Sequence, residues 1–164
     1  MMAEAGARRS FRSSSVEETI DFGRRLGELL EAGDVLILTG DLGAGKTQLT
    51  KGIAAALGVG SDVTSPTFNI LMTYPGRELE LDHFDLYRLE DASQLEDTGL
   101  FDLLGADGVC VIEWGEQFAD EIGDERLDVF LTRLDGEAAP GEEPAREISL
   151  VPHGARANEI VSQL

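Results

Sequence analysis

Apolar side chains along this chain follow helical spacing in some stretches and strand-like spacing in others. From Ser15 onward they stand at Ile20, Phe22, Leu26, Leu29 and Leu30, and Leu26 lies three or four positions from Phe22, Leu29 and Leu30. Ser15, with Glu18 three residues later, has the capping-box pattern that begins a helix. The pattern therefore predicts a first helix that begins near Ser15 and ends at Gly33 and Asp34.

The next stretch predicts a strand and a second helix. Residues 35–38, Val-Leu-Ile-Leu, form an apolar run typical of a strand that is buried on both faces. Residues 47–57 return to helical spacing, with apolar side chains at Leu49, Ile53, Ala56 and Leu57. We therefore expect strand, loop and helix in direct succession.

Further apolar runs predict the rest of a sheet. Residues 68–74 and 79–84 are strand-like and are separated by the turn Pro-Gly-Arg-Glu, which predicts an antiparallel hairpin. One or two short helices are expected over residues 90–105, and a terminal helix over 154–164. Three more strands are predicted over residues 108–114, 126–132 and 148–153. The chain contains no internal repeat.

The loop between the first predicted strand and the second helix matches the phosphate-loop pattern G-x-x-x-x-G-K-[ST] at residues 40–47. Its glycines allow backbone N–H groups to point at phosphates, and the following helix presents its positive end to the same anion. Lys46 would reach the β- and γ-phosphates, and the Thr47 hydroxyl would ligate Mg²⁺. A glycine-rich turn that binds nothing is the alternative. The predicted nucleotide contacts are Gly40, Asp41, Leu42, Gly43, Ala44, Gly45, Lys46, Thr47 and Gln48.

Alternating helices and strands around a phosphate loop predict an α/β fold. We expect a three-layer P-loop NTPase-like domain with a mainly parallel sheet and an antiparallel hairpin. The length of 164 residues suits one domain. Residues 15–164 should form it, with residues 1–14 as a flexible N-terminal lead-in and residues 135–146 as an exposed acidic loop.

Three carboxylates fall near predicted strand ends, where ligands gather in open α/β sheets. Asp82 and Asp85 close one strand, and either could hold Mg²⁺ as a Walker-B carboxylate does. We favour Asp85, because it stands where the strand leaves the sheet; turn and helix-cap aspartates are the alternative. Glu113 closes another strand and could orient the attacking water or accept its proton.

Other polar and aromatic residues near these positions are open to two interpretations. Trp114 could pack in the core or shield the nucleotide. Ser65 and Thr67 could sense the γ-phosphate or simply form a turn before a strand. Cys110 lies in an apolar run and is expected to be a small core residue rather than a nucleophile.

The net charge limits the class of direct partner. With 32 acidic and 13 basic residues, the formal charge is −19. Nucleic-acid affinity comes largely from Lys and Arg that neutralise phosphates, so direct RNA or DNA binding by this chain alone is not expected. The N-terminal segment has no apolar core of a secretory signal, and no apolar run approaches the ~20 residues that span a bilayer. We therefore expect a cytoplasmic protein without membrane contact.

Several motifs together resemble one known family. In this order and spacing, GDLGAGKT, SPTF, HFDLYRLED, LEDTGLFDLL and IEWGE are similar to the TsaE (YjeE) family. These are small bacterial ATPases needed for the threonylcarbamoyladenosine modification of tRNA. The resemblance covers about residues 15–132, and HFDLYR and IEW are more specific than the phosphate loop.

The resemblance implies ligands, partners and residue roles. ATP and Mg²⁺ would be the ligands, with Lys46 and Thr47 in the loop and Asp85 near the metal. Glu113 would act in hydrolysis and lie close enough to the metal to count among its ligands. The TsaD–TsaB heterodimer would be the partner; TsaD performs the transfer, and tRNA is reached only through that complex. No arginine finger is apparent among the motifs, so turnover by the isolated chain should be slow.

Three rival functions remain at this point. A small-molecule kinase also needs a phosphate loop and carboxylates, but the basic residues after the loop form no cluster that suits an arginine-rich lid. A GTPase could use the D-x-x-G sequence at residues 102–105, yet this lies in a helical pattern and no N-K-x-D stretch exists. The third rival is a nucleotide-binding scaffold that does not hydrolyse, against which Glu113 is a weak argument.

Overall fold

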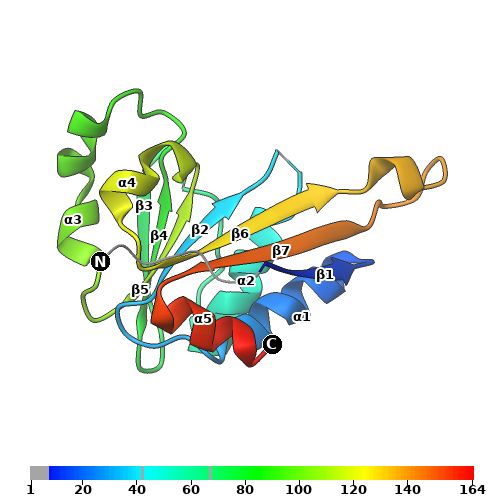
Figure 1. Ribbon diagram of the computed structural model, residues 1–164, viewed down its shortest axis with the longest axis horizontal. Coiled ribbons are helices and arrows are strands. Elements are labelled where there is room, and N and C mark those ends of the chain that lie inside the picture. Colours follow the sequence, from blue (N-terminus) through cyan, green and yellow to red (C-terminus); the bar gives the residue numbers. More distant parts are fainter. Residues whose placement is uncertain (1–7, 42, 67) are drawn as a thin grey trace.

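A single seven-stranded sheet organises the chain, with the strand order β1-β7-β6-β2-β5-β4-β3 (Figure 1). The computed structural model describes residues 8–41, 43–66 and 68–164. The four central strands are mutually parallel, whereas β3, β7 and β1 pair antiparallel at the two sides. The strands are β1 (Arg9–Ser13), β2 (Val35–Thr39), β3 (Leu71–Pro75), β4 (Glu80–Asp85), β5 (Val109–Glu113), β6 (Arg126–Arg133) and β7 (Arg146–His153).

Helices cover both faces of the sheet and make three layers (Figure 1). One face packs against α1 (Val16–Gly27), α2 (Lys46–Leu57) and α5 (Ala155–Ser162). The other face is covered by shorter pieces: the 3₁₀ segments η1 (Ala92–Thr98) and η2 (Glu116–Phe118), with α3 (Leu100–Leu103) and α4 (Ala119–Ile122). The predicted three-layer α/β fold with a mainly parallel sheet and an antiparallel hairpin is confirmed.

Strand β2 shows why an uninterrupted apolar run forms the centre of the sheet. Leu36 and Leu38 point into the core beneath α1 and α2, whereas Val35 and Ile37 point into the core on the opposite face. All four are buried. A strand with helices on both sides must be apolar at every position, because successive side chains alternate between the two faces.

The helix that precedes the phosphate-loop strand begins as its sequence predicts. The Ser15 side chain accepts a hydrogen bond from the Glu18 backbone N–H and caps α1. Helix α1 then packs closely on α2 through Gly23 and Gly52. A Cβ atom on Gly52 would lie 2.0 Å from the Ile20 carbonyl oxygen, so only glycine allows this approach. The packing fixes α2, whose first residue is Lys46, against the sheet.

Two expectations about the termini and loops need correction. Residues 9–13 form strand β1 rather than a flexible lead-in, because they pair antiparallel with β7 in the register Arg9↔Leu150 to Ser13↔Arg146. β1 is an edge strand with one buried residue, Ser13, so its local pattern is weak. The acidic loop ends before Arg146, which is buried and begins β7; the 3₁₀ segment η3 (Asp135–Glu137) lies within it. Residues 1–7 lie outside the described part of the chain.

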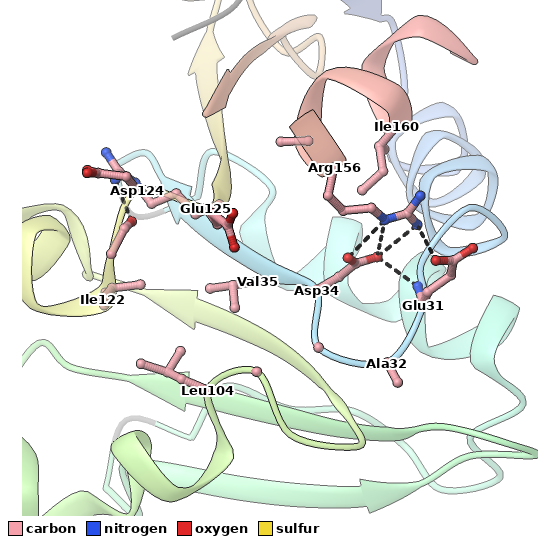
Figure 2. Close-up of a pocket in the computed structure, with 15 residues that line it drawn as sticks. Glu31, Ala32, Asp34, Val35, Leu104, Ile122, Asp124, Glu125, Arg156 and Ile160 are labelled. Atoms are coloured by element: carbon pink, nitrogen blue, oxygen red, sulfur yellow. Dashed lines mark hydrogen bonds and ion pairs between the residues drawn. The ribbon is translucent and has the colours of Figure 1, made fainter. Parts of the chain in front are cut away.

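An ion pair ties the last helix to the amino end of β2 (Figure 2). The Arg156 guanidinium on α5 donates to both oxygens of the buried Asp34, at 3.0 Å from Nε to Oδ1 and 3.0 Å from Nη2 to Oδ2. This pairing raises the pKa of Arg156 further above its ordinary value. The pair borders a cavity of about 570 Å³ between α5, β2 and Leu104, at the end of the sheet opposite the phosphate loop. Within the described ranges, no helix is both long and apolar enough to cross a membrane.

Candidate functional site

The phosphate loop opens onto a cavity of about 640 Å³ at the carboxyl ends of β2, β4 and β5. Parallel pairing sets Glu113 of β5 beside both Leu38 of β2 and Asp85 of β4, so the strand ends meet at one edge. The cavity is lined by Val16, Gly43, Gly45, Lys46, Thr47, Gln48, Ser65, Asp85, Tyr87, Glu113, Trp114, Glu143 and Arg146. The candidate catalytic and metal-binding residues Lys46, Thr47, Asp85 and Glu113 are therefore brought together.

The loop has the backbone geometry of an anion cradle. Gly43 and Gly45 have φ values of +81° and +108°, in the left-handed region that favours glycine. A Cβ atom on Gly40 would lie 2.6 Å from the Leu131 carbonyl oxygen, so this position also requires glycine. The loop ends at the amino terminus of α2, where backbone N–H groups without helical partners favour an anion.

Not every predicted nucleotide contact borders this cavity. Gly43, Gly45, Lys46, Thr47 and Gln48 line it. Gly40, Asp41 and Ala44 instead border a neighbouring hollow against the end of β6. Leu42, predicted as a contact, and Thr67, considered as a phosphate sensor, lie outside the described residues.

Lys46 is a buried cation held between a carboxylate and an aromatic ring. Its side chain is 6% exposed, and its Nζ lies 4.0 Å from Glu113 Oε1. The same Nζ lies 4.1 Å from the centroid of the Trp114 ring, a cation–π contact. Both contacts hold the ammonium at the cavity wall, next to the cradle.

Glu113 is fixed from the other side by a histidine that borders the core. His83 Nε2 lies 2.7 Å from Glu113 Oε2, and neither residue is more than 3% exposed. The carboxylate only accepts here, so Nε2 is the donor. One oxygen of Glu113 is thus bound by His83, and the other faces Lys46. His83 is the first residue of the HFDLYR motif, but no role was predicted for it, because its pairing with Glu113 depends on the register of β4 with β5.

The structure separates the two candidate aspartates. Asp85 lines the cavity, accepts a hydrogen bond from the Tyr87 N–H at 2.9 Å and lies 3.4 Å from the Ser65 hydroxyl. Asp82, three residues earlier, does not line the cavity and lies 3.4 Å from the Thr73 hydroxyl of β3. Burial, reinforced by the neighbouring Glu80, raises the pKa of Asp82 to about 7. Asp85, unlike Asp82, lines the cavity, and its role at a metal stays a prediction.

Two aromatic rings form one wall of the cavity. Trp114 and Tyr87 both line it, and their ring centroids lie 5.0 Å apart at an interplanar angle of 58°. Trp114 has φ +59°, an unusual value for a bulky residue, which turns the chain directly after β5. Of its two interpretations, the position beside the cavity favours a shield over a core residue. Cys110, by contrast, is a buried core residue as expected, and burial raises the pKa of its thiol to about 12.

An arginine from outside the motifs also enters the cavity. Arg146, at the start of β7, is 9% exposed and donates from Nη2 to the Gly43 carbonyl oxygen of the phosphate loop at 2.9 Å. It also bonds the Pro144 carbonyl and pairs with Glu143 at 2.7 Å. The sequence does not indicate an arginine at the site, because residue 146 follows a loop of low apolar content and 103 positions separate it from Gly43.

Comparisons with known proteins agree with this geometry. The family model for "Threonylcarbamoyl adenosine biosynthesis protein TsaE" matches residues 13–140. The chain belongs to the TsaE family. It is 38% identical over 154 residues to TsaE of Bacillus subtilis, covering 94% of this chain and 92% of the relative. It is 44% identical over 122 residues to TsaE of Treponema pallidum, covering 74% and 90%.

A solved structure extends the likeness to the TsaE fold itself. The crystal structure of Bacillus subtilis YdiB superimposes with a TM-score of 0.75 at 32% sequence identity, over 96% of this chain and 93% of that one. The range matched by the TsaE model contains the phosphate loop, His83, Asp85 and Glu113, and it ends before Arg146.

Proposed function

We propose that this TsaE-family protein is an ATPase that binds and hydrolyses ATP with Mg²⁺, in support of the TsaD–TsaB complex in the N6-threonylcarbamoyladenosine (t6A37) modification of tRNA. One observation carries the proposal. The phosphate-loop ammonium of Lys46 and the carboxylate of Glu113 face each other at 4.0 Å, in a cavity that Thr47 and Asp85 also line. A phosphate-binding cation, oxygen donors for a metal and a buried carboxylate are the groups that phosphoryl transfer to water needs.

The phosphates of ATP would bind at the cradle formed by Gly43 to Thr47. Backbone N–H groups at the start of α2 and the ammonium of Lys46 would compensate their charge. Trp114 and Tyr87 would cover the same side of the cavity and exclude water. Arg146 would keep the loop in place through its bond to the Gly43 carbonyl.

The residues present fit Mg²⁺. The hydroxyl of Thr47 and the carboxylate of Asp85 are hard oxygen donors at one edge of the cavity. The described residues contain no cluster of three or more His, Cys, Asp or Glu side chains that could hold a metal. Mg²⁺ at nucleotide sites is usually held by one or two protein oxygens together with phosphates and water. When bound, it would neutralise charge on the phosphate oxygens.

Glu113 would orient the attacking water and accept its proton. With one oxygen bonded to His83, it retains one oxygen, at 4.0 Å from Lys46, that could reach a water near the γ-phosphate. This arrangement supports Glu113 as the water-positioning residue more than as a direct metal ligand.

The partner, rather than this chain, would hold the tRNA. A formal charge of −19 repels a phosphate backbone, so a protein surface is the better match. A kinase is less well supported, because Arg146 is the one arginine among the described residues that line the cavity. Glu113, held at the strand end by His83, favours an ATPase over a scaffold that does not hydrolyse.

Calorimetric titration tests which nucleotide the protein binds. In the presence of Mg²⁺ we expect ATP to bind at least tenfold more tightly than GTP, since the chain contains no N-K-x-D stretch to recognise guanine. Tighter binding of GTP, or no heat with either nucleotide, would contradict the proposal.

A further inference from the structure

A buried histidine touches the proposed water-positioning carboxylate without lining the cavity. His83 is 0% exposed, and its Nε2 lies 2.7 Å from Glu113 Oε2. Asp85 is the register partner of Glu113, and His83 stands two residues before Asp85 on β4. The His83–Glu113 hydrogen bond therefore joins two neighbouring parallel strands diagonally, on one face of the sheet. Because the cavity lining includes Glu113 but not His83, the histidine can act on the reaction only through the carboxylate.

The hydrogen bonding of His83 fixes which nitrogen carries the proton. Nδ1 has no hydrogen-bond partner within the described ranges, and it is shielded from solvent. A proton on Nδ1 would be buried without an acceptor, which is costly. Nε2 therefore carries a proton, which it donates to Glu113.

The carboxylate of Glu113 is held by contacts with His83 and Lys46. Glu113 is 3% exposed, and its neighbours Val111 and Ile112 on β5 are fully buried apolar residues. Its contacts with His83 and Lys46 come from opposite oxygens, so they fix both the position and the rotation of the carboxylate. Lys46 would engage phosphate during the reaction, whereas His83 would keep its bond throughout.

We propose that His83 is the positioning residue that orients Glu113 for ATP hydrolysis. This rests on the proposed function. Its Nε2–H holds Oε2 and leaves Oε1 facing the cavity, so loss of this bond should lower the hydrolysis rate more than the affinity for ATP.

Two amide substitutions distinguish orientation from packing. Glutamine can place its amide nitrogen near the position of histidine Nε2, whereas asparagine reaches only as far as Nδ1. His83→Gln should therefore keep single-turnover hydrolysis within about threefold of the wild type. His83→Asn should lower it about 10–100-fold, with the dissociation constant for ATP changed less than about threefold.

His153 offers a matched control. Its Nε2 lies 2.9 Å from Asp128 Oδ2, so it forms a similar histidine–carboxylate pair, between β7 and β6 and away from the cavity. His153→Asn should leave hydrolysis unchanged. The double variant of His83→Asn with Glu113→Gln should be no slower than Glu113→Gln alone, because both substitutions remove the same function.

The emission of Trp114 gives a second measurement that does not depend on turnover. Trp114 is the one tryptophan of the sequence, follows Glu113 directly and holds Lys46 Nζ at 4.1 Å from its ring. His83→Asn should shift its emission maximum in the ligand-free protein, whereas His83→Gln and His153→Asn should not.

The outcomes separate this inference from the proposed function. Slow hydrolysis by Glu113→Gln together with normal hydrolysis by His83→Asn would overturn the inference alone. Equal losses in His83→Gln and His83→Asn would also overturn it, since they would indicate a packing role. A wild type that does not hydrolyse ATP, with or without TsaD–TsaB, would overturn the proposed function. The Trp114 shift would then still decide whether His83 orients Glu113.

Discussion

Lys46 is a buried cation that lies beside the carboxylate of Glu113 and over the ring of Trp114. Lys46→Ala should weaken ATP binding at least tenfold, because the charge of the β- and γ-phosphates would lose its compensating ammonium. Titration calorimetry measures this directly. Lys51→Ala is the matched control: Lys51 is on the same helix, is 37% exposed and lies 4.0 Å from Asp62, so its loss should leave affinity unchanged. Undiminished binding by Lys46→Ala would contradict a phosphate-loop site.

Asp82 is a buried carboxyl that the proposed mechanism does not use. Its folded-state pKa is raised from 3.8 to about 7, chiefly by burial, so between these values the folded state binds a proton that the unfolded state releases. The contribution of Asp82 to the free energy of unfolding should therefore fall as the pH rises from about 4 to 7. Asp82→Asn should remove this dependence and stabilise the protein at pH 8 by roughly 1–4 kcal/mol.

Urea unfolding at pH 5 and pH 8 measures the effect of Asp82→Asn. The stabilisation should be larger at pH 8 than at pH 5. Asp62→Asn is a suitable control, since that carboxylate is 84% exposed. An Asp82→Asn variant that is less stable than the wild type at pH 8 would show that the charged carboxylate is needed.

At the scale of single residues, the sequence predicts groups whose roles follow from a local motif. Lys46, Thr47 and Asp85 belong to such motifs and line the cavity. The roles of His83, although it lies in the HFDLYR motif, and of Arg146 could not be predicted, because each acts at the site through long-range contacts. His83 meets Glu113 across 30 positions of sequence, and Arg146 meets Gly43 across 103.

At the scale of elements, α5 is fastened to the sheet by a pair that is distant from the nucleotide cavity. Arg156→Met would leave the buried Asp34 without its guanidinium partner and should lower the free energy of unfolding by about 1–3 kcal/mol (Figure 2). ATP affinity should stay unchanged, since this pair lies at the amino end of β2 and the phosphate loop at the other end.

Chemical denaturation with a surface control checks the role of Arg156. Arg24 pairs with Asp21 at 2.9 Å, but both side chains are about half exposed or more, at 49% and 65%. Arg24→Met should therefore change stability by less than about 1 kcal/mol. Equal effects of the two substitutions would contradict a structural role for the Arg156–Asp34 pair.

The elements themselves show where local patterns suffice. β2, α1 and α2 have strong periodicity or caps, and they form where they are predicted, although α1 ends at Gly27 rather than at Gly33 and Asp34. Strand β1 and the early start of β7 depend on pairing with each other, in the register Ser13↔Arg146. Residues 9–13 are too polar for their own sequence pattern to predict a strand. They were therefore expected to be a flexible lead-in.

At the scale of the whole molecule, a strongly acidic chain carries the proposed site for an anionic ligand. The formal charge is −19, yet Lys46, Arg146 and the start of α2 lie at one cavity, which Asp85, Glu113 and Glu143 also line. Under the proposed function, ATP would bind at this cavity while the acidic surface repels nucleic acid. This surface also suits regulation by a protein partner, which can complete or order the site.

Single-turnover hydrolysis of ATP tests the central claim most directly. Wild type and Glu113→Gln are compared with and without the TsaD–TsaB pair, and Glu116→Gln, at an exposed carboxylate three residues away, is the control. We expect slow hydrolysis by the wild type alone and faster hydrolysis with the pair. Glu113→Gln should bind ATP within about threefold of the wild type but hydrolyse it about 10²–10⁴-fold more slowly. Hydrolysis by Glu113→Gln at the wild-type rate in the presence of the pair would contradict Glu113 as the water-positioning residue.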